Sequence, residues 1–262
     1  MTIVTLTSDW GVGNHYAGAV KGTLLRLIPG VTIVDITHQV PCYNIMHASF
    51  VLRNAYPHFP ENTIHLVGIN TEADLQSPHI VVKHQGHYFI GADNGIFSLL
   101  FDQNPQEMVV IDIFQASNYF TFSTRDVFAR AASMIAQGKP LSKLGLEYKV
   151  LNERIMFRPV VRPDQILGKV IFIDDYENVF VNIDQPLFRK FGVGRPFVIN
   201  FRSADTGIDK ISTSYSDVAE GEKLALFGST GFLEIAINKG NASRLLGLRM
   251  NETVTIDFSN HR

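Results

Sequence analysis

Met1-Thr-Ile-Val-Thr-Leu-Thr-Ser-Asp9-Trp-Gly11 opens the chain, and this stretch decides the fold class. Its first seven residues are largely apolar and β-branched, which predicts a strand. A helical pattern begins near His15, so Asp9 falls in the first strand-to-helix loop. Ligands bind at the carboxyl ends of strands in open α/β sheets. Asp9 is therefore a candidate acceptor for a ribose 2′,3′-diol, while a helix N-cap or turn role would also explain it.

The first half of the chain continues this alternation of strands and helices. Strands are predicted at residues 32–36, 63–69 and 108–113, a hairpin at 79–90, and helices at 44–56 and 126–137. After Leu151 short strands follow one another at 167–173, 179–183, 196–200, 223–227, 232–237 and 253–258, with only 242–246 helical between them. The pattern predicts an α/β N-terminal domain at 1–150, a linker at 151–164 and a mostly β, barrel-like C-terminal domain at 165–262.

Composition excludes several classes of protein. The 262 residues carry a net charge of −2, 45% hydrophobic and 18% charged residues, which is typical of a soluble globular protein and gives no footprint for a nucleic acid. No apolar run is long enough to span a membrane, and the N-terminus does not resemble a signal peptide. Cys42 is the single cysteine, so no internal disulfide is expected and the cytoplasm is the predicted location.

Two loops of the predicted N-terminal domain contain side chains that can either bind a ligand or cap a helix. After the second strand, Asn44 can cap the next helix, and Tyr43 can offer its ring to a flat ligand or pack on its own helix. Before the 126–137 helix, Ser123 and Thr124 can cap the helix or form an anion-binding nest with free backbone N–H groups. Residues 91–95 contain Asp-Asn-Gly, which is a turn by its own chemistry, with the Asp expected to bond locally.

A third loop lies between two strands of the C-terminal domain. Asp174 can accept from an ammonium group and Asn178 can pair with a base edge, although a hairpin turn rich in Asp and Asn needs no ligand. Other templates fail: the chain has no Gly-x-Gly-x-x-Gly after a strand, no Walker loop and no Gly-x-Ser-x-Gly elbow. Its nine His residues show no metal spacing, so neither a metal nor a cofactor is expected.

Seven stretches in order resemble the S-adenosylmethionine (SAM) hydroxide adenosyltransferases, or SAM hydrolases, which are related to the SAM-dependent fluorinase and chlorinase. The matching stretches are residues 5–11, 16–22, 34–41, 86–95, 121–128, 174–178, and 228–231 with 233–242. The resemblance implies an α/β domain, a barrel-like β domain and a homotrimer that holds SAM between the N-terminal domain of one subunit and the C-terminal domain of the next. SAM, adenosine and methionine are the implied ligands.

The resemblance also implies roles for single residues. Asp9 would take the ribose hydroxyls, and Tyr43 would lie beside the nucleoside. In the C-terminal domain the implied contacts are Asp174 to the methionine ammonium, Ser229 to its carboxylate, Asn178 to the adenine and Tyr215 stacking near the adenine.

The chain departs from the family at the residues that activate water. Family hydrolases resemble one another in an Asp-Arg-His set, and the corresponding positions here are Asn70, Ser77 and Ser123. These side chains can orient a water molecule but cannot take its proton near neutral pH. Asp74 or His79 would substitute if the loop brought either inward. Ser123-Thr124 places two hydroxyls where the fluorinase has Tyr-Ser, but the halogenases' Tyr-Pro-Ala-Thr-Gly pattern is absent at residues 70–74.

The sequence therefore favours a SAM hydrolase that releases adenosine and L-methionine by attack of water or hydroxide at ribose C5′. The alternative is a non-catalytic SAM or adenosine sensor or scavenger of the same fold, because the binding residues are kept while the activating set is not. A SAM-dependent halogenase and a trimeric structural protein with an empty cleft are the remaining alternatives.

Overall fold

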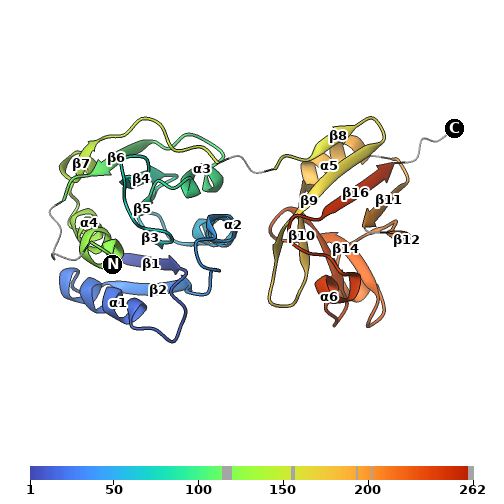
Figure 1. Cartoon of the computed structure of the whole chain (residues 1–262), viewed down its shortest axis with the longest axis horizontal. Coiled ribbons are helices and arrows are strands. Elements are labelled where there is room, and N and C mark those ends of the chain that lie inside the picture. The colour runs from blue at the N-terminus through green and yellow to red at the C-terminus, as the bar shows by residue number, and fades with distance from the viewer. Residues whose placement is uncertain (114–119, 155–156, 193, 202, 259–262) are drawn as a thin grey trace. The chain divides into compact units, whose positions relative to one another are not determined.

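The computed structural model describes residues 1–113, 120–154, 157–192, 194–201 and 203–258. The chain divides into two compact units, Met1–Ile155 and Met156–Arg262, each with its own sheet (Figure 1). No helix among these described ranges is long and apolar enough to cross a membrane.

The N-terminal unit is built on a seven-stranded sheet in the order β2-β1-β3-β5-β4-β6-β7. The strands are β1 (Ile3–Ser8), β2 (Thr32–Thr37), β3 (Ile64–Gly68), β4 (His79–His84), β5 (His87–Ala92), β6 (Glu107–Ile111) and β7 (Gly145–Glu147). β2, β1, β3 and β5 run parallel, whereas β4 is antiparallel to β5 and β6, and β7 is antiparallel to β6. This is the α/β domain that the opening strand and the alternating pattern predict.

Helices cover both faces of this sheet because its strands alternate their side chains between two apolar cores. In β4, Val81 joins the core that contains α1 (Tyr16–Leu27), the π-helical turn η2 (Thr124–Phe128) and α4 (Ala129–Ala136). Its neighbours Ile80 and Val82 join the opposite core, with α2 (Ile45–Ala55) and α3 (Ile96–Leu100). Figure 1 shows the two groups of helices on opposite sides of the strands. Short 3-10 turns complete the unit at η1 (Tyr56–His58) and η3 (Leu141–Lys143).

The strand order places a topological switch point between β1 and β3. The chain leaves β1 through α1 and returns on one side as β2, then passes through α2 and returns on the other side of β1 as β3. The loop leaving β1 therefore leads towards β2 and the loop leaving β3 leads towards β4, and the carboxyl ends between them are the usual ligand position in such sheets. Ser8 is paired with Gly68, so Asp9 and residue 70 follow adjacent strand ends.

The C-terminal unit is strand-rich, as predicted. Its strands are β8 (Val160–Arg162), β9 (Gln165–Ile173), β10 (Val179–Asp184), β11 (Phe197–Phe201), β12 (Ser203–Ile208), β13 (Ile211–Ser212), β14 (Lys223–Phe227), β15 (Phe232–Ile237) and β16 (Thr253–Phe258). The sheet follows the order β12-β11-β16-β9-β10-β15-β14-β13, with β8 paired to β9. The pairings described run as an open path, so a closed barrel stays a prediction. Two helices, α5 (Gln185–Gly192) and α6 (Ala242–Leu246), and the turn η4 (Tyr215–Asp217) accompany the strands.

The prediction that residues 242–246 form the only helix among these strands is wrong, because α5 precedes them. Pro186 suggests a break in the sequence, but proline is tolerated in the first turn of a helix. Leu187, Phe188 and Phe191 then pack on the β core while Arg189 and Lys190 remain outside it. In the N-terminal unit α3 was not predicted either, since its apolar residues are buried all round and show no helical periodicity.

Candidate functional site

Backbone bonds join the loops that leave β1 and β2. Gly11 N–H donates to His38 O at 2.7 Å and Val40 N–H donates to Ser8 O at 3.3 Å. Tyr43 N–H donates to Asp9 Oδ2 at 2.8 Å. The N-cap of α1 is His15, so Asp9 is not a helix cap. Among the described residues nothing donates to Asp9 Oδ1, which leaves a carboxylate oxygen available at the switch point.

Tyr43 presents its ring to solvent. The residue has a φ of 62° and is 73% exposed, so the ring does not pack on α2. The capping role predicted for Asn44 is confirmed, because its Oδ1 accepts from His47 N–H at 3.0 Å. An exposed ring on the residue that bonds to Asp9 through its backbone could meet a flat ligand anchored through its sugar.

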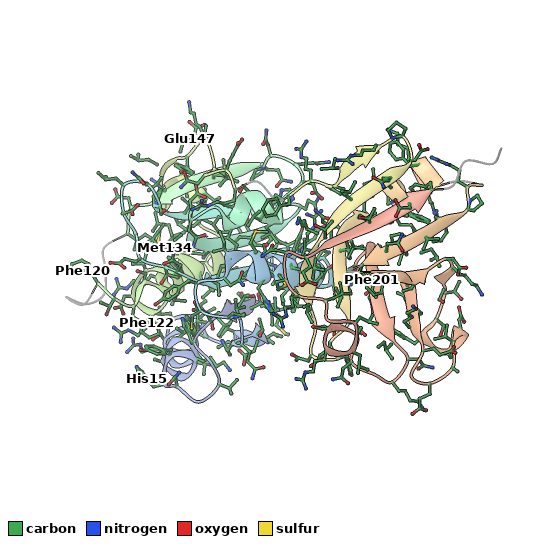
Figure 2. All side chains as sticks on the ribbon, turned by 45° about the vertical axis from the view of Figure 1, so that its right-hand side comes forward. His15, Phe120, Phe122, Met134, Glu147 and Phe201 are labelled. Carbon is green, nitrogen blue, oxygen red and sulfur yellow. The ribbon has the colours of Figure 1, made fainter. Side chains whose placement is uncertain are left out.

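Trp10 brings the ends of three strands together. Its ring lies so close to Gly68 at the end of β3 that a Cβ on this glycine would stand 2.4 Å from Trp10 Cζ2. The ring stacks on His38, which follows β2, with 5.7 Å between centroids. The edge of Phe122, which is labelled in Figure 2, meets the same ring at 5.8 Å. Through Trp10 the Asp9 loop therefore contacts the segment that carries Ser123.

The positions of the family's activating set carry no base. Asn70 is exposed with a φ of 45°, and its carbonyl accepts from Asn94 Nδ2 at 3.2 Å. Ser77 is half-buried, and its backbone N–H donates to Asp74 Oδ1 at 2.6 Å. Ser123 precedes η2 without a side-chain cap bond, and Thr124 is 1% exposed with a hydroxyl that has no partner in the described structure. The capping alternative for these two hydroxyls is therefore wrong.

His79 and Asp74 differ in what they could do as substitute bases. Asp74 Oδ1 accepts from the backbone N–H groups of Gln76 and Ser77, so the carboxylate organises its own turn. His79 Nε2 donates to Thr71 O at 2.7 Å, which directs the ring proton to that nitrogen and leaves a lone pair on Nδ1. Burial lowers the pKa of His79, despite the opposing bond to Thr71, so the ring is neutral at pH 7.

The turn predicted at residues 91–95 is confirmed, except for the role of its aspartate. Gly95 has a φ of 99°, and Asn94 Oδ1 accepts from Ile96 N–H at 3.2 Å. Asp93 does not bond locally but accepts from Tyr148 Oη at 2.9 Å and from Asn152 N–H at 2.8 Å. Burial and this bond raise the pKa of Tyr148 to about 12. The carboxylate thus anchors the segment after β7.

In the C-terminal unit, Asp174 and Asn178 form the turn between β9 and β10. Asp174 Oδ1 accepts from Asn178 N–H at 2.8 Å, and Oδ2 accepts from Asn178 Nδ2 at 3.2 Å. Glu177 takes the left-handed conformation that closes the turn, with a φ of 64°. Asp174 and Asn178, the two predicted ligand contacts, are therefore adjacent. Their hydrogen bonds to each other are also consistent with the alternative, a hairpin turn that needs no ligand.

Tyr215 bonds to a buried carboxylate, Glu234, which also lies against the turn that precedes Ser229. Tyr215 Oη donates to Glu234 Oε1 at 2.6 Å, and Glu234 is only 3% exposed. A Cβ on Gly228 would stand 3.1 Å from Glu234 Oε2, so the turn that carries exposed Ser229 lies against the same side chain. Burial, the bond to Glu234 and the charges of Glu234 and Asp174 raise the pKa of Tyr215 well above its ordinary value.

The raised pKa of Glu234 predicts a stability that depends on pH. Burial raises the pKa of Glu234, the hydrogen bond from Tyr215 opposes this, and the charge of Asp174 adds to it. Because the folded state then holds its proton more tightly than the unfolded chain, the stabilisation is complete below the unfolded pKa and is lost as the pH rises through the folded pKa.

We expect Glu234→Gln to reduce this loss, since the amide stays neutral and can still accept from Tyr215. Urea unfolding between pH 4 and pH 8 should show a free energy of unfolding that falls less steeply in the variant than in the wild type. Glu220→Gln is the matched control, because Glu220 is exposed and paired with Lys239 at 2.9 Å. Parallel pH profiles for wild type and Glu234→Gln would contradict the expectation.

Three residues beside the candidate positions of the two units were not predicted, and each had a signal in the sequence. Trp10 is the only tryptophan and adjoins Asp9, His38 directly follows a strand, and Glu234 interrupts the apolar run of β15. In the ranges the structure describes, no group of three or more His, Cys, Asp or Glu could hold a metal ion.

Sequence models of two domains match this chain. The N-terminal domain of SAM hydroxide adenosyltransferase matches residues 4–145, and the C-terminal domain matches residues 168–255. Because these two models cover most of the chain, this two-domain α/β protein belongs to the SAM hydroxide adenosyltransferase family.

Individual relatives agree with this assignment. An (R)-S-adenosyl-L-methionine hydrolase from Methanocaldococcus jannaschii is 30% identical, covering 98% of this chain and 97% of the relative. A fluorinase from Nocardia brasiliensis is 23% identical over 97% of this chain and 96% of the relative. The crystal structure of an uncharacterized conserved protein from Thermotoga maritima has a TM-score of 0.88 at 32% identity, covering 98% of this chain and all of that one.

Proposed function

We propose that the protein hydrolyses S-adenosyl-L-methionine to adenosine and L-methionine. The observation that carries the proposal is Asp9, whose Oδ1 is left without a donor at the switch point of a chain that belongs to this family. A carboxylate that accepts from the vicinal hydroxyls of a ribose would occupy that oxygen. Since the relatives' name specifies the (R) form and the amino-acid carbon is already defined as L, we propose the (R) epimer at sulfur as the substrate to test first.

The reaction balances without a cofactor. A water oxygen attacks ribose C5′ in line with the C5′–S bond, which breaks and leaves its electron pair on sulfur. Methionine departs as a neutral thioether, and the water proton must go to a base or to solvent. Because the positive sulfonium is a good leaving group, the protein needs to align and deprotonate water rather than to protonate the departing group.

His79 is our proposed acceptor for that proton. Its ring is neutral, its tautomer is set by Thr71, and its Nδ1 forms no hydrogen bond with the described residues. The ring packs edge-on against Phe128, at the end of the helical turn that begins with the unpartnered hydroxyl of Thr124. Asn70, Ser77, Ser123 and Thr124 would orient the water, since hydroxyl and amide groups serve as donors and acceptors.

The C-terminal residues would hold the rest of the substrate. We propose that Asp174 meets the methionine ammonium, Ser229 its carboxylate and Asn178 the adenine, while Tyr215 stacks near the base and Tyr43 lies beside the nucleoside. The proposal extends to a homotrimer with inter-subunit sites, to a barrel-like closure of the C-terminal sheet and to a cytoplasmic location. Sedimentation velocity at micromolar concentration tests the trimer directly.

The function is tested by incubating the pure protein with each sulfonium epimer of SAM and measuring adenosine and methionine by chromatography. We expect equimolar products, with turnover reduced about 10²–10⁴-fold by His79→Gln, the usual range for loss of general-base help. Asp74→Asn is the control from the same loop and should retain most activity.

Other outcomes separate the alternatives. Calorimetric binding of SAM without products would favour the sensor or scavenger. Halogenated nucleoside formed in chloride or fluoride would favour a halogenase, in line with the more distant fluorinase similarity. If the protein bound none of SAM, adenosine and methionine, the proposal would be refuted.

A further inference from the structure

A row of polar groups, formed by Ser8, His38, Asp35 and Lys21, adjoins the Asp9 loop. Ser8 Oγ lies 2.6 Å from His38 Nδ1, and both side chains are buried. On the far side of the ring, Nε2 lies 3.1 Å from Asp35 Oδ1, an ion-pair distance, although the ring N–H does not point straight at the carboxylate. Lys21 of α1 binds the other oxygen of Asp35 at 2.5 Å. The row therefore links α1, β2 and β1.

The hydrogen bonds favour one orientation of this row. Trp10 N–H approaches Ser8 Oγ at 3.5 Å, so the serine hydroxyl proton is left to point at His38 Nδ1. The ring proton then sits on Nε2, which faces Asp35. Burial acts to raise the pKa of Asp35, but the hydrogen bond and charge of Lys21, together with the adjacent His38 ring, outweigh it and lower the pKa, so the carboxylate remains charged.

The order Ser-His-Asp does not make Ser8 a nucleophile. Ser8 has no exposed surface, and it lies at the end of a paired strand. The polar groups instead contact the Asp9 loop. Ser8 directly precedes Asp9, and the His38 ring stacks on Trp10 with an interplanar angle of 16°. One histidine thus contacts the residues on both sides of Asp9.

We propose that His38 is a positioning residue of the nucleoside site, which holds Ser8 and the Trp10 ring and thereby aims Asp9 at the ribose hydroxyls. The inference rests on the proposed function, because it assigns the sugar to Asp9. It goes further by making recognition of the 2′- and 3′-hydroxyls depend on a side chain that does not touch the ligand. Asp35, 3.1 Å from Nε2, favours the tautomer that leaves Nδ1 to accept from Ser8.

The test compares adenosine with 2′,3′-dideoxyadenosine by calorimetry. We expect His38→Ala to weaken adenosine binding about three- to tenfold, the factor of one net hydrogen bond, and to leave dideoxyadenosine binding unchanged. In an Asp9→Ala background, the same substitution should have no further effect. His38→Asn should recover part of the loss, because its amide can replace Nδ1 towards Ser8. His58→Ala, at an exposed histidine, is the control.

Two results would overturn the inference. Equal loss of both nucleosides in His38→Ala would show a general structural role, and full additivity with Asp9→Ala would show that His38 does not act through Asp9. If the wild type bound no adenosine, this result would refute the proposed function and leave the positioning role of His38 to be tested by itself. Amide exchange would then decide the positioning role separately, since His38→Ala should speed exchange of the Tyr43 N–H that Asp9 holds, and unchanged exchange would refute it.

Discussion

Asp9→Ala is expected to lower the affinity for adenosine and for SAM about 10- to 100-fold. The variant removes the oxygen that is free for the ribose, and a hydrogen bond to a charged acceptor is worth about 1.5–3 kcal/mol. It also removes the partner of the Tyr43 N–H, which lies 2.8 Å from Oδ2. Calorimetry with adenosine measures the effect, and 2′,3′-dideoxyadenosine should bind both proteins equally.

Asp9→Asn separates the two roles of this side chain. The amide oxygen can still accept from Tyr43 N–H, so the loop should remain intact while the charge is lost. We expect an intermediate affinity for adenosine in this variant. Undiminished adenosine binding in Asp9→Ala would contradict the assignment of the sugar to the first loop.

Gly68→Ala is the second substitution for which we expect a large effect. The added Cβ would stand 2.4 Å from Trp10 Cζ2, a contact that side chains do not tolerate, so the indole must move. Overpacking of this kind costs about 1–3 kcal/mol of unfolding free energy. Because Trp10 adjoins Asp9 and stacks on His38, adenosine binding should weaken together with stability. Urea unfolding and calorimetry measure the two losses.

Two controls identify the cause. Gly22→Ala makes the same chemical change within α1, where a Cβ meets nothing within 4 Å, and should stabilise the protein by about 0.5–1 kcal/mol. In a Trp10→Ala background, Gly68→Ala should lose most of its penalty because the clashing ring is gone. A penalty that persists without the ring would show that the indole is not its source.

Local periodicity was sufficient for most of the fold. Alternating or β-branched runs such as Ile3–Ser8 and Phe232–Ile237 bury one or both faces, so their residue types report their secondary structure directly. The hydrophobic pattern did not predict two helices, α3 and α5, whose burial or sequence differs from that of an amphipathic surface helix. α3 is buried all round, and α5 contains a proline whose position within the first turn only the structure shows.

The candidate site was predictable as residue types in loops but not as an arrangement. Asp9, Tyr43 and Asp174 were found from composition and order along the chain. Their partners were not, because hydrogen bonds such as Tyr215 to Glu234 join segments 19 residues apart in sequence, and local spacing carries no information about such pairs.

By itself, the sequence determined that a carboxylate follows the first strand of an α/β domain and that no base occupies the family's activating positions. Only the tertiary structure decided that Asp9 keeps one oxygen free, that Trp10 lies over Gly68 and that His38 bonds Ser8. The reason is physical: side-chain identity is local, whereas the donors that satisfy or spare a buried polar atom come from strands that meet only when the sheet has formed.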